Sequence, residues 1–187
     1  MNRCEWCKSD ELYIKYHDEQ WGVPVHDDRV HSEFLILEAA QAGLSWITIL
    51  RKRDNFKKAL DGFDPQKIAE YGEDKINELM ADPGIIRNRR KIDAFINNSA
   101  RFLEIQKEFV SFDSYIWGFV DNKPVINSIK SISEVPATSP LSDHISRELK
   151  KRGFKFMGST IVYSYLQAVG IIDDHVNSCF RKSDKVV

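Results

Sequence analysis

The stretch KKRGFKFMGSTIVYSYLQAVGIIDDHVNSC, residues 150–179, decides how this chain folds. The segment before it has apolar residues at every fourth position, which form one face of a helix: Leu141, Ile145 and Leu149. Gly153 is well placed just past the end of that helix, where glycine is favoured. Ser159 is a candidate N-cap for a second helix that ends at Gly170. The pattern predicts a helix, a tight hairpin bracketed by Gly153 and Gly158, and a second helix, over residues 140–170.

The turn between these two helices carries a concentration of positive charge. Its basic residues lie close to Gly153: Lys150, Lys151, Arg152 and Lys155. Backbone N–H groups in a Gly-x-x-x-x-Gly turn can point together at an anion, and a nucleic-acid phosphate is the natural candidate. The competing interpretation is an ordinary helical hairpin with a solvated basic face.

Composition restricts the classes of protein that this chain can be. Its 187 residues, 42% of them hydrophobic, suffice for a real core, and we expect a single domain spanning 1–187. The formal net charge of −1 excludes a surface coated in positive charge, so any nucleic-acid surface must be local. No apolar run approaches the roughly 20 residues of a membrane span, and the first residues lack a signal peptide. We therefore expect a soluble, cytoplasmic protein.

The rest of the chain shows helical patterns. Apolar spacing and capping residues predict helices at 29–50 with a break at Gly43 and a cap at Ser45, from Asp64-Pro65 onward, around 76–80, at 91–109 and at 114–120. The first thirty residues predict a short helix and a long ordered loop, and residues 124–138 a surface connection. No segment alternates convincingly like a strand. The predicted fold class is all-α.

Two pairs of candidate metal ligands lie at opposite ends of the chain. Cys4 and His17 come from the N-terminal region, and His175 and Cys179 form a His-x3-Cys pair. Two thiolates and two imidazoles are the set that zinc prefers in closed tetrahedral sites, so such a zinc would be structural and would join the chain ends. Two alternatives remain: Cys7 replaces His17, because Cys4-x2-Cys7 is itself a zinc spacing, or these are unrelated buried residues. Three cysteines, an odd number, do not suggest a disulfide framework.

Glu38 lies inside the most apolar helix of the chain, LILEAAQAGLSWITIL at 35–50. A carboxylate in such a place is costly unless it has a partner, so Glu38 is the candidate catalytic residue. The alternative is that Glu38 faces outward or caps a neighbouring backbone. Aromatic residues follow it or crowd the N-terminal region: Trp6, Tyr13, Tyr16, Trp21 and Trp46. Together they predict a pocket for a flat, cationic heterocycle, held by ring stacking and by the carboxylate.

Several long blocks of this sequence match one family. They are Cys4-x-Trp6, YIKYHDEQWGVP at 13–24, LEAAQAGLSWITIL at 37–50, GIIRNRRKI at 84–92, KKRGFKFMGSTI at 150–161 and DHVNSC at 174–179. With these blocks, in this order, the chain resembles the bacterial 3-methyladenine DNA glycosylase I family, within the helix-hairpin-helix glycosylases. The resemblance implies an all-helical fold of two lobes, with DNA bound at the hairpin. It also implies a structural zinc held by Cys4, His17, His175 and Cys179, which leaves Cys7 as an extra thiol.

The resemblance further implies a reaction. The damaged nucleotide is flipped out of alkylated double-stranded DNA, and hydrolysis of its N-glycosidic bond releases free 3-methyladenine and leaves an abasic site, without lyase activity. Methylation leaves the base positively charged, so it is already a good leaving group and the enzyme mainly has to select it. We expect the protein to act as a monomer, away from membranes.

The family's functional positions map onto residues of this chain. Glu38 matches the position that recognises the base edge, and Trp46 matches the stacking residue. The remaining aromatic residues would complete the cage: Tyr16, with Tyr13, Trp6 and Trp21 nearby. The hairpin set implied for DNA contact is Gly153, Lys155, Gly158 and Ser159.

A general base is missing from this scheme. Asp173 and Asp174 follow the hairpin, where many relatives in the wider superfamily have a catalytic aspartate, but the family that the chain resembles lacks that residue. Asp174 adjoins His175, so we expect it to support the zinc ligand. We therefore expect water to attack an oxocarbenium-like sugar with Glu38 nearby and without an essential base. Two other functions compete: a DNA-binding or damage-sensing module without chemistry, and a zinc-dependent hydrolase with an open metal position.

Overall fold

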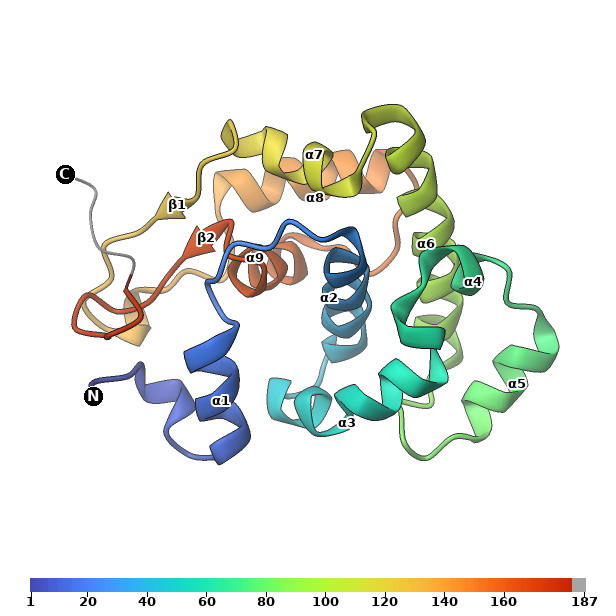
Figure 1. Cartoon of the computed structure of the whole chain (residues 1–187), viewed down its shortest axis with the longest axis horizontal. Helices are drawn as coiled ribbons and strands as arrows, with labels where there is room; N and C mark the ends of the chain where they lie inside the picture. The colour runs from blue at the N-terminus through green and yellow to red at the C-terminus, as the bar shows by residue number, and fades with distance from the viewer. Residues whose placement is uncertain (183–187) are drawn as a thin grey trace.

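Helices dominate the computed structural model, which describes residues 1–182 (Figure 1). The α-helices are α1 Glu11–Glu19, α2 Asp28–Gln41, α3 Trp46–Ala59, α4 Pro65–Ala69, α5 Glu73–Ala81, α6 Arg89–Phe109, α7 Phe112–Trp117, α8 Pro140–Lys151 and α9 Ser159–Ala168. Short 3-10 helices span Glu5–Cys7, Asp61–Phe63, Gly118–Val120 and Ile132–Glu134, and the strands are β1 Val125–Ile126 and β2 Ile172–Asp173. The predicted helical class is confirmed.

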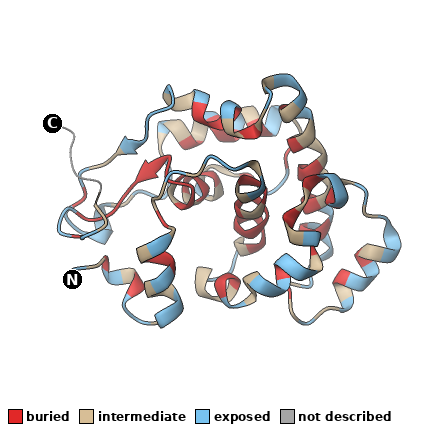
Figure 2. Cartoon of the chain, in the orientation of Figure 1, coloured by how far each residue is buried: buried red, intermediate tan, exposed pale blue. Residues whose placement is uncertain are grey.

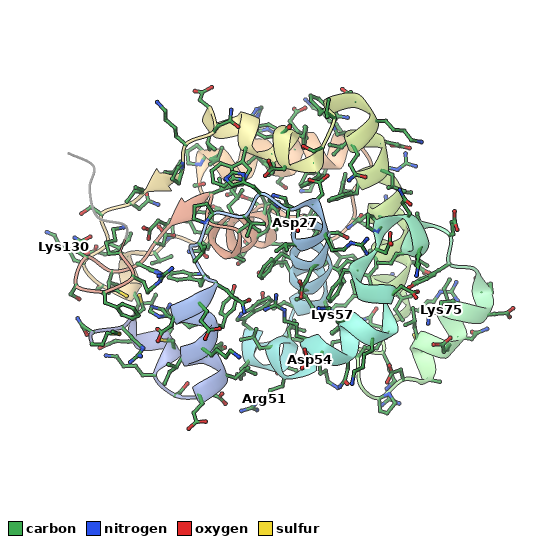
Figure 3. All side chains as sticks on the ribbon, viewed as in Figure 1. Asp27, Arg51, Asp54, Lys57, Lys75 and Lys130 are labelled. Atoms are coloured by element: carbon green, nitrogen blue, oxygen red, sulfur yellow. The ribbon has the colours of Figure 1, made fainter. Side chains whose placement is uncertain are left out.

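Polar side chains begin several helices where the sequence predicts a start. The carboxylates of Asp27 and Asp64 accept hydrogen bonds from N–H groups in the first turns of α2 and α4, and Pro65 occupies the first position of α4. Figure 3 shows Asp27 at the start of α2. Ser45 precedes α3 as predicted, but its hydroxyl bonds to Thr48 Oγ1 (2.8 Å) and makes no capping bond.

Local details differ from the sequence-based expectations. Ser159 is the first residue of α9, and Gly158 takes the N-cap position. α6 starts at Arg89, two residues earlier than expected, because the Asn88 side chain caps it. α1 is the short helix expected within the first thirty residues, and it carries Tyr13 and Tyr16. β1 and β2 form a parallel pair only two residues long, which is too short to produce a sequence period.

α2 lies at the centre of the molecule and packs against α3, α6, α7 and α9 (Figure 1). Most of its length is buried (Figure 2). α3 instead carries charged side chains on its outer side, among them Arg51, Asp54 and Lys57 (Figure 3). The two ends of the described chain meet on the side of α1, where the Phe180 N–H donates to the Asn2 carbonyl (2.9 Å). None of the helices within residues 1–182 is long and apolar enough to cross a membrane.

The turn after α9 is fixed by the segment that follows α1. The Gly22 N–H donates to the Gln167 carbonyl (2.9 Å), and the Val25 N–H donates to the Val169 carbonyl (3.0 Å). Gly170 has φ +69°, and a Cβ at this position would lie 2.3 Å from the carbonyl carbon of Val23. Only glycine combines the left-handed backbone with such a close approach. This contact holds the N-terminal region against the end of α9.

We predict that Gly170→Ala destabilises the fold severely, by at least about 3 kcal/mol, because it adds both backbone strain and a clash with backbone atoms. Urea unfolding followed by circular dichroism measures the loss. Gly118→Ala is the matched control, since φ is −60° there and no heavy atom lies within 4 Å of the added Cβ. That variant should stay within about 1 kcal/mol of the wild type. Equal losses in the two variants would contradict the role of this contact.

Candidate active site and metal centre

The fold brings the four predicted metal ligands together. The ligand atoms of Cys4, His17, His175 and Cys179 all lie within 4.8 Å of one another, and all four residues are buried. His17 comes from α1, whereas His175 follows β2 directly. The two imidazole rings stack with their centroids 4.8 Å apart, and Cys179 Sγ lies 3.4 Å from His17 Nε2. Two sulfur and two nitrogen donors at these separations fit the tetrahedral set that zinc prefers.

The surroundings of the two imidazoles also fit a metal. Asp18 Oδ1 lies 2.8 Å from His17 Nδ1, and Arg3 pairs with the same carboxylate (2.8 Å), which leaves Nε2 of His17 directed at the cluster. His175 Nδ1 is buried and has no hydrogen-bond partner among residues 1–182. Burial lowers the pKa of His175 to about 4 and raises the pKa of the Cys4 thiol to about 12. Without a cation these side chains are neutral, so metal binding would have to displace thiol protons.

The extra thiol, Cys7, lies outside this cluster. It is buried, and its S–H group donates to the carbonyl of Cys4 (3.0 Å). Cys7 therefore packs behind the loop that carries Cys4, and the arrangement favours His17 over Cys7 as the fourth ligand.

Aromatic rings connect the metal cluster to a neighbouring pocket. Trp21 stacks on His175 with ring centroids 4.5 Å apart, and Trp6 makes an edge contact with Trp21 at 5.1 Å. Trp6 also contacts His17 at 5.5 Å. Whatever fixes the cluster therefore also fixes one wall of the pocket.

The pocket is a cavity of about 220 Å³, and every residue predicted for base binding lines it. Its lining includes Trp6, Tyr13, Tyr16, Trp21, Glu38 and Trp46. Further lining residues were not assigned to the site from the sequence: Gln41, Ile132, Val135, Ser164 and Gln167. Ile132 and Val135 belong to the segment predicted as a surface connection, so that expectation is incomplete. Ser164 and Gln167 are polar residues three positions apart in α9, a helix rich in apolar residues, and this spacing was the signal in the sequence that could have identified them.

Glu38 projects from the last turns of α2 into this pocket. Its side chain is buried, with 2% of the residue exposed, and Oε2 has no hydrogen-bond partner among residues 1–182. Burial raises the pKa of Glu38 to about 8. Trp46 Nε1 is likewise buried without a partner in the described chain. A buried acceptor and a buried donor left unpaired in one pocket indicate that a ligand pairs with them.

Tyr13 and Tyr16 occupy different places in the aromatic wall. Tyr16 faces Trp46 with ring centroids 5.5 Å apart, which leaves two large rings on one side of the cavity. Tyr13 packs edge-on against Trp6 (5.4 Å), and its hydroxyl accepts a hydrogen bond from the Ile47 N–H (3.0 Å). Tyr13 therefore holds the start of α3, and with it Trp46, as well as lining the pocket.

A buried lysine holds the start of the loop that joins α2 to α3. Lys91 Nζ donates to the carbonyls of Ala40 (2.8 Å) and Ala42 (2.7 Å) at the end of α2. Burial lowers the pKa of Lys91, and no ion pair with it occurs within the described chain. A cation at a helix C-terminus is stabilised by the unpaired carbonyls and the helix dipole. Lys91 thus fixes the point where the chain leaves α2 between Glu38 and Trp46.

The hairpin has the predicted glycine-bracketed form. At the end of α8, the Phe154 N–H donates to the Leu149 carbonyl (3.0 Å), and Gly153 adopts φ +89°. The Asn98 side chain of α6 accepts from the Lys155 N–H and donates to the Lys155 carbonyl, both at 2.8 Å. The backbone N–H of Lys155 is therefore already used, and only its ammonium group remains for an anion.

The other hairpin residues predicted for DNA contact lie at the start of α9. Gly158 takes the N-cap position, and the Ser159 hydroxyl lies 2.8 Å from that of Ser142. Beside them, Lys155 lines an open groove with Arg90 and the partly exposed Phe156. The basic side of the hairpin thus continues onto α6.

Asp174, the candidate base that follows the hairpin, is surrounded by donors. It is 1% exposed and accepts from Tyr163 Oη (2.6 Å), Gln167 Nε2 (2.7 Å) and Asn127 Nδ2 (2.7 Å). These donors occupy both carboxylate oxygens. Asp174 therefore orients neighbouring side chains instead of activating water, and one of them, Gln167, lines the pocket. The backbone N–H of the predicted metal ligand His175 donates to Asp173 Oδ1 (2.9 Å), not to Asp174.

The chain is similar to known proteins over almost its whole length. A family model described as methyladenine glycosylase matches residues 6–182. DNA-3-methyladenine glycosylase 1 of Escherichia coli strain K12 is 45% identical over 179 residues, which cover 96% of each chain. A crystal structure of 3-methyladenine DNA glycosylase I is similar with a TM-score of 0.94 at 45% identity, covering 97% of this chain and all of that chain. A structure of 3-methyladenine DNA glycosylase I from Staphylococcus aureus, concerned with its recognition of 3-methyladenine, has the same TM-score at 34% identity, covering 99% and 98% of the two chains.

The buried carboxylate predicts a stability difference that depends on pH. The pKa of Glu38 is raised from 4.5 to about 8, so its neutral form stabilises the fold at low pH, and this contribution is lost as pH rises through 8. Glu38→Gln keeps the shape but cannot ionise. Relative to the wild type, the variant should gain roughly 2–4 kcal/mol in free energy of unfolding between pH 4.5 and pH 8.5.

Urea unfolding of both proteins at several pH values measures this gain. Glu19→Gln, on the exposed face of α1, is the control and should follow the wild type throughout. A constant difference between Glu38→Gln and the wild type at all pH values would show that the carboxylate is not strained by burial.

Proposed function

Because the chain belongs to the methyladenine glycosylase family, we infer that it is a DNA repair enzyme that excises 3-methyladenine from alkylated DNA by hydrolysing the N-glycosidic bond. The observation that supports this most directly is the unpaired, buried Oε2 of Glu38 in a pocket walled by aromatic rings. Such a pocket suits a flat cation, and N3-methylation gives the adenine of a nucleotide a positive charge. A base that is stacked and paired inside a duplex cannot reach a pocket in the protein, so the nucleotide would have to be flipped out of the duplex to enter.

Recognition by charge explains how the enzyme selects the damaged base. Base stacking on aromatic rings contributes about 1–3 kcal/mol of binding free energy per base, but a neutral adenine would gain the same stacking free energy. Glu38 adds the discrimination, because its carboxylate is ionised at little cost only when a cation enters the pocket. The neutral parent base would leave Glu38 either protonated or buried without a counter-charge.

The remaining chemistry needs little from the protein. The cationic base leaves readily, and water attacks the oxocarbenium-like sugar while the Glu38 carboxylate stabilises nearby positive charge. The use of both Asp174 oxygens by other donors supports a mechanism without an essential aspartate base. The pocket lining in the described chain includes no lysine that could form a Schiff base with the sugar. This favours a monofunctional glycosylase that leaves an abasic site.

The metal site is proposed as structural. Cys4, His17, His175 and Cys179 would hold zinc, and four protein ligands would leave no position for water. When bound, the ion supplies a link between the two ends of the chain. The stacking of Trp21 on His175 supports a role in shaping the pocket wall.

DNA contact is proposed for the hairpin. The Lys155 ammonium group, the N-terminus of α9 at Gly158 and Ser159, and the left-handed turn at Gly153 form one positively polarised edge. Arg90 on α6 extends it along the groove. A pocket formed entirely within one chain supports a monomer as the active form, with double-stranded DNA as the partner.

Release of free base from methylated duplex DNA tests the function. We expect the wild type to release 3-methyladenine, with kcat/KM rising with pH and levelling off above about 8 as Glu38 ionises. Glu38→Gln should lower release about 100-fold and remove this pH dependence, because it keeps the shape of the pocket without the charge. Chromatography of the released bases gives the rates, and fluorescence anisotropy with duplex DNA should show unchanged DNA affinity.

Two results would contradict this scheme. A folded, zinc-loaded wild type that releases no base would leave the DNA-binding module as the function. A Glu38→Gln variant with normal release would show that the carboxylate does not select the base.

Removal of zinc should lower stability without changing the chemistry of the folded enzyme. We expect a chelator to lower the thermal unfolding midpoint and to leave base release at 25 °C within about twofold while circular dichroism shows a folded protein. Cys179→Ser should unfold at a lower temperature even before chelation, whereas Cys7→Ser, outside the cluster, should respond to the chelator like the wild type. Loss of base release from folded, metal-free enzyme would indicate a catalytic metal.

A further inference from the structure

Gln167 has an unusually constrained side chain for a pocket residue. It lies on α9 and lines the cavity together with Glu38 and Trp46. Its Nε2 group donates to Asp174 Oδ2 (2.7 Å). Within residues 1–182, the carbonyl oxygen Oε1 and the second N–H of Nε2 have no hydrogen-bond partner.

The environment of Asp174 determines which end of the Gln167 amide points toward it. Asp174 Oδ2 also accepts from Tyr163 Oη (2.6 Å), and Oδ1 accepts from Asn127 Nδ2 (2.7 Å). A carboxylate in such a network can only accept hydrogen bonds. Reversing the amide would place Oε1 of Gln167 against Oδ2, which would lose a charge-assisted hydrogen bond and bring two acceptors together. The buried carboxylate thus fixes the amide nitrogen at Asp174 and leaves Oε1 as the end of the amide that can accept a hydrogen bond from a ligand.

We propose that Gln167, oriented by Asp174, is a specificity-determining residue that presents a hydrogen-bond acceptor to the flipped base. Together with Glu38, it gives the pocket two acceptors on separate helices, α9 and α2. A methylated 6-aminopurine carries an exocyclic amino donor, whereas a methylated 6-oxopurine carries a carbonyl acceptor at the same ring position. The pocket therefore favours 3-methyladenine over 3-methylguanine, although both bases are cationic in DNA. This inference rests on the proposed glycosylase function.

Gln41 offers a comparison within the same pocket. It lines the cavity from the end of α2, but no side-chain hydrogen bond within residues 1–182 fixes its amide. An amide that can rotate presents either its donor or its acceptor to a base. Gln41 can therefore turn either group toward a base, whereas the contact with Asp174 fixes the orientation of the Gln167 amide.

The test compares two bases released in one reaction. Duplex DNA treated with a methylating agent so that it contains both 3-methyladenine and 3-methylguanine is digested, and mass spectrometry quantifies both free bases in the same sample. The ratio of their release rates is independent of enzyme concentration, folded fraction and overall DNA affinity. Gln167→Met, which preserves length without an acceptor, should lower the preference for 3-methyladenine about 10-fold, the effect of about one hydrogen bond. Gln41→Met, the matched control, should change the ratio by less than about twofold.

Each outcome decides a separate question. An unchanged ratio in Gln167→Met, or an equal fall in Gln41→Met, would overturn the role of Gln167 while base release by the wild type upholds the glycosylase function. Absence of 3-methyladenine release by the wild type would refute the function itself. Where release of either base is too slow to quantify, calorimetric dissociation constants for free 3-methyladenine and free 3-methylguanine test the same hydrogen bond, and Gln167→Met should reduce the ratio of the two constants while Gln41→Met leaves it unchanged.

Discussion

The structure depends on one costly feature, the buried carboxyl group of Glu38, whose Oε2 has no hydrogen-bond partner within residues 1–182. Glu38 sits near the end of α2, the helix that packs against α3, α6, α7 and α9 and is buried along most of its length. Burial raises its pKa to about 8, and its Oε2 stays unpaired among residues 1–182. Packing around α2 must supply the free energy that this carboxylate costs. In return, the pocket has a site whose interaction with a cation is much stronger than with a neutral molecule of the same shape.

Elements distant in sequence hold the walls of this pocket at fixed positions. Lys91 on α6 secures the end of α2, and Tyr13 on α1 secures the start of α3, so the loop between Glu38 and Trp46 is held at both sides. On the other wall, the proposed metal ligands and the rings stacked on them connect the N-terminal segment to the end of the chain. The close approach at Gly170 adds a contact through backbone atoms alone. Rigid walls reduce the conformational entropy lost when a base is bound.

The end of α9 links the hairpin to the pocket. The same helix begins at the hairpin, at Gly158, and carries Gln167 in the pocket wall nine residues later. Asp174 follows the hairpin, and its carboxylate accepts hydrogen bonds from Gln167, Tyr163 and Asn127. A leaving group that is already cationic makes a strong base unnecessary. The Asp174 carboxylate can then contribute to selectivity through Gln167, and selectivity is the harder problem for this enzyme.

The sequence by itself determined the helical class and the glycine-bracketed hairpin, because apolar periodicity and glycine positions are local properties. It also identified the aromatic residues of the pocket and the candidate metal ligands by their chemistry, but it left Cys7 as an alternative to His17. Glu38 could be singled out for the same reason, as an acid within an apolar run. Only the tertiary structure decided that Glu38 Oε2 is unpaired in the described part of the chain, that Asn98 uses the Lys155 N–H, and that Ile132 and Val135 reach the pocket. The role of Asp174 also became visible only there, since its contacts with Asn127 and Gln167 join segments with no common sequence pattern. Hydrogen bonds and burial depend on which distant groups meet, and that is set by packing of the whole chain.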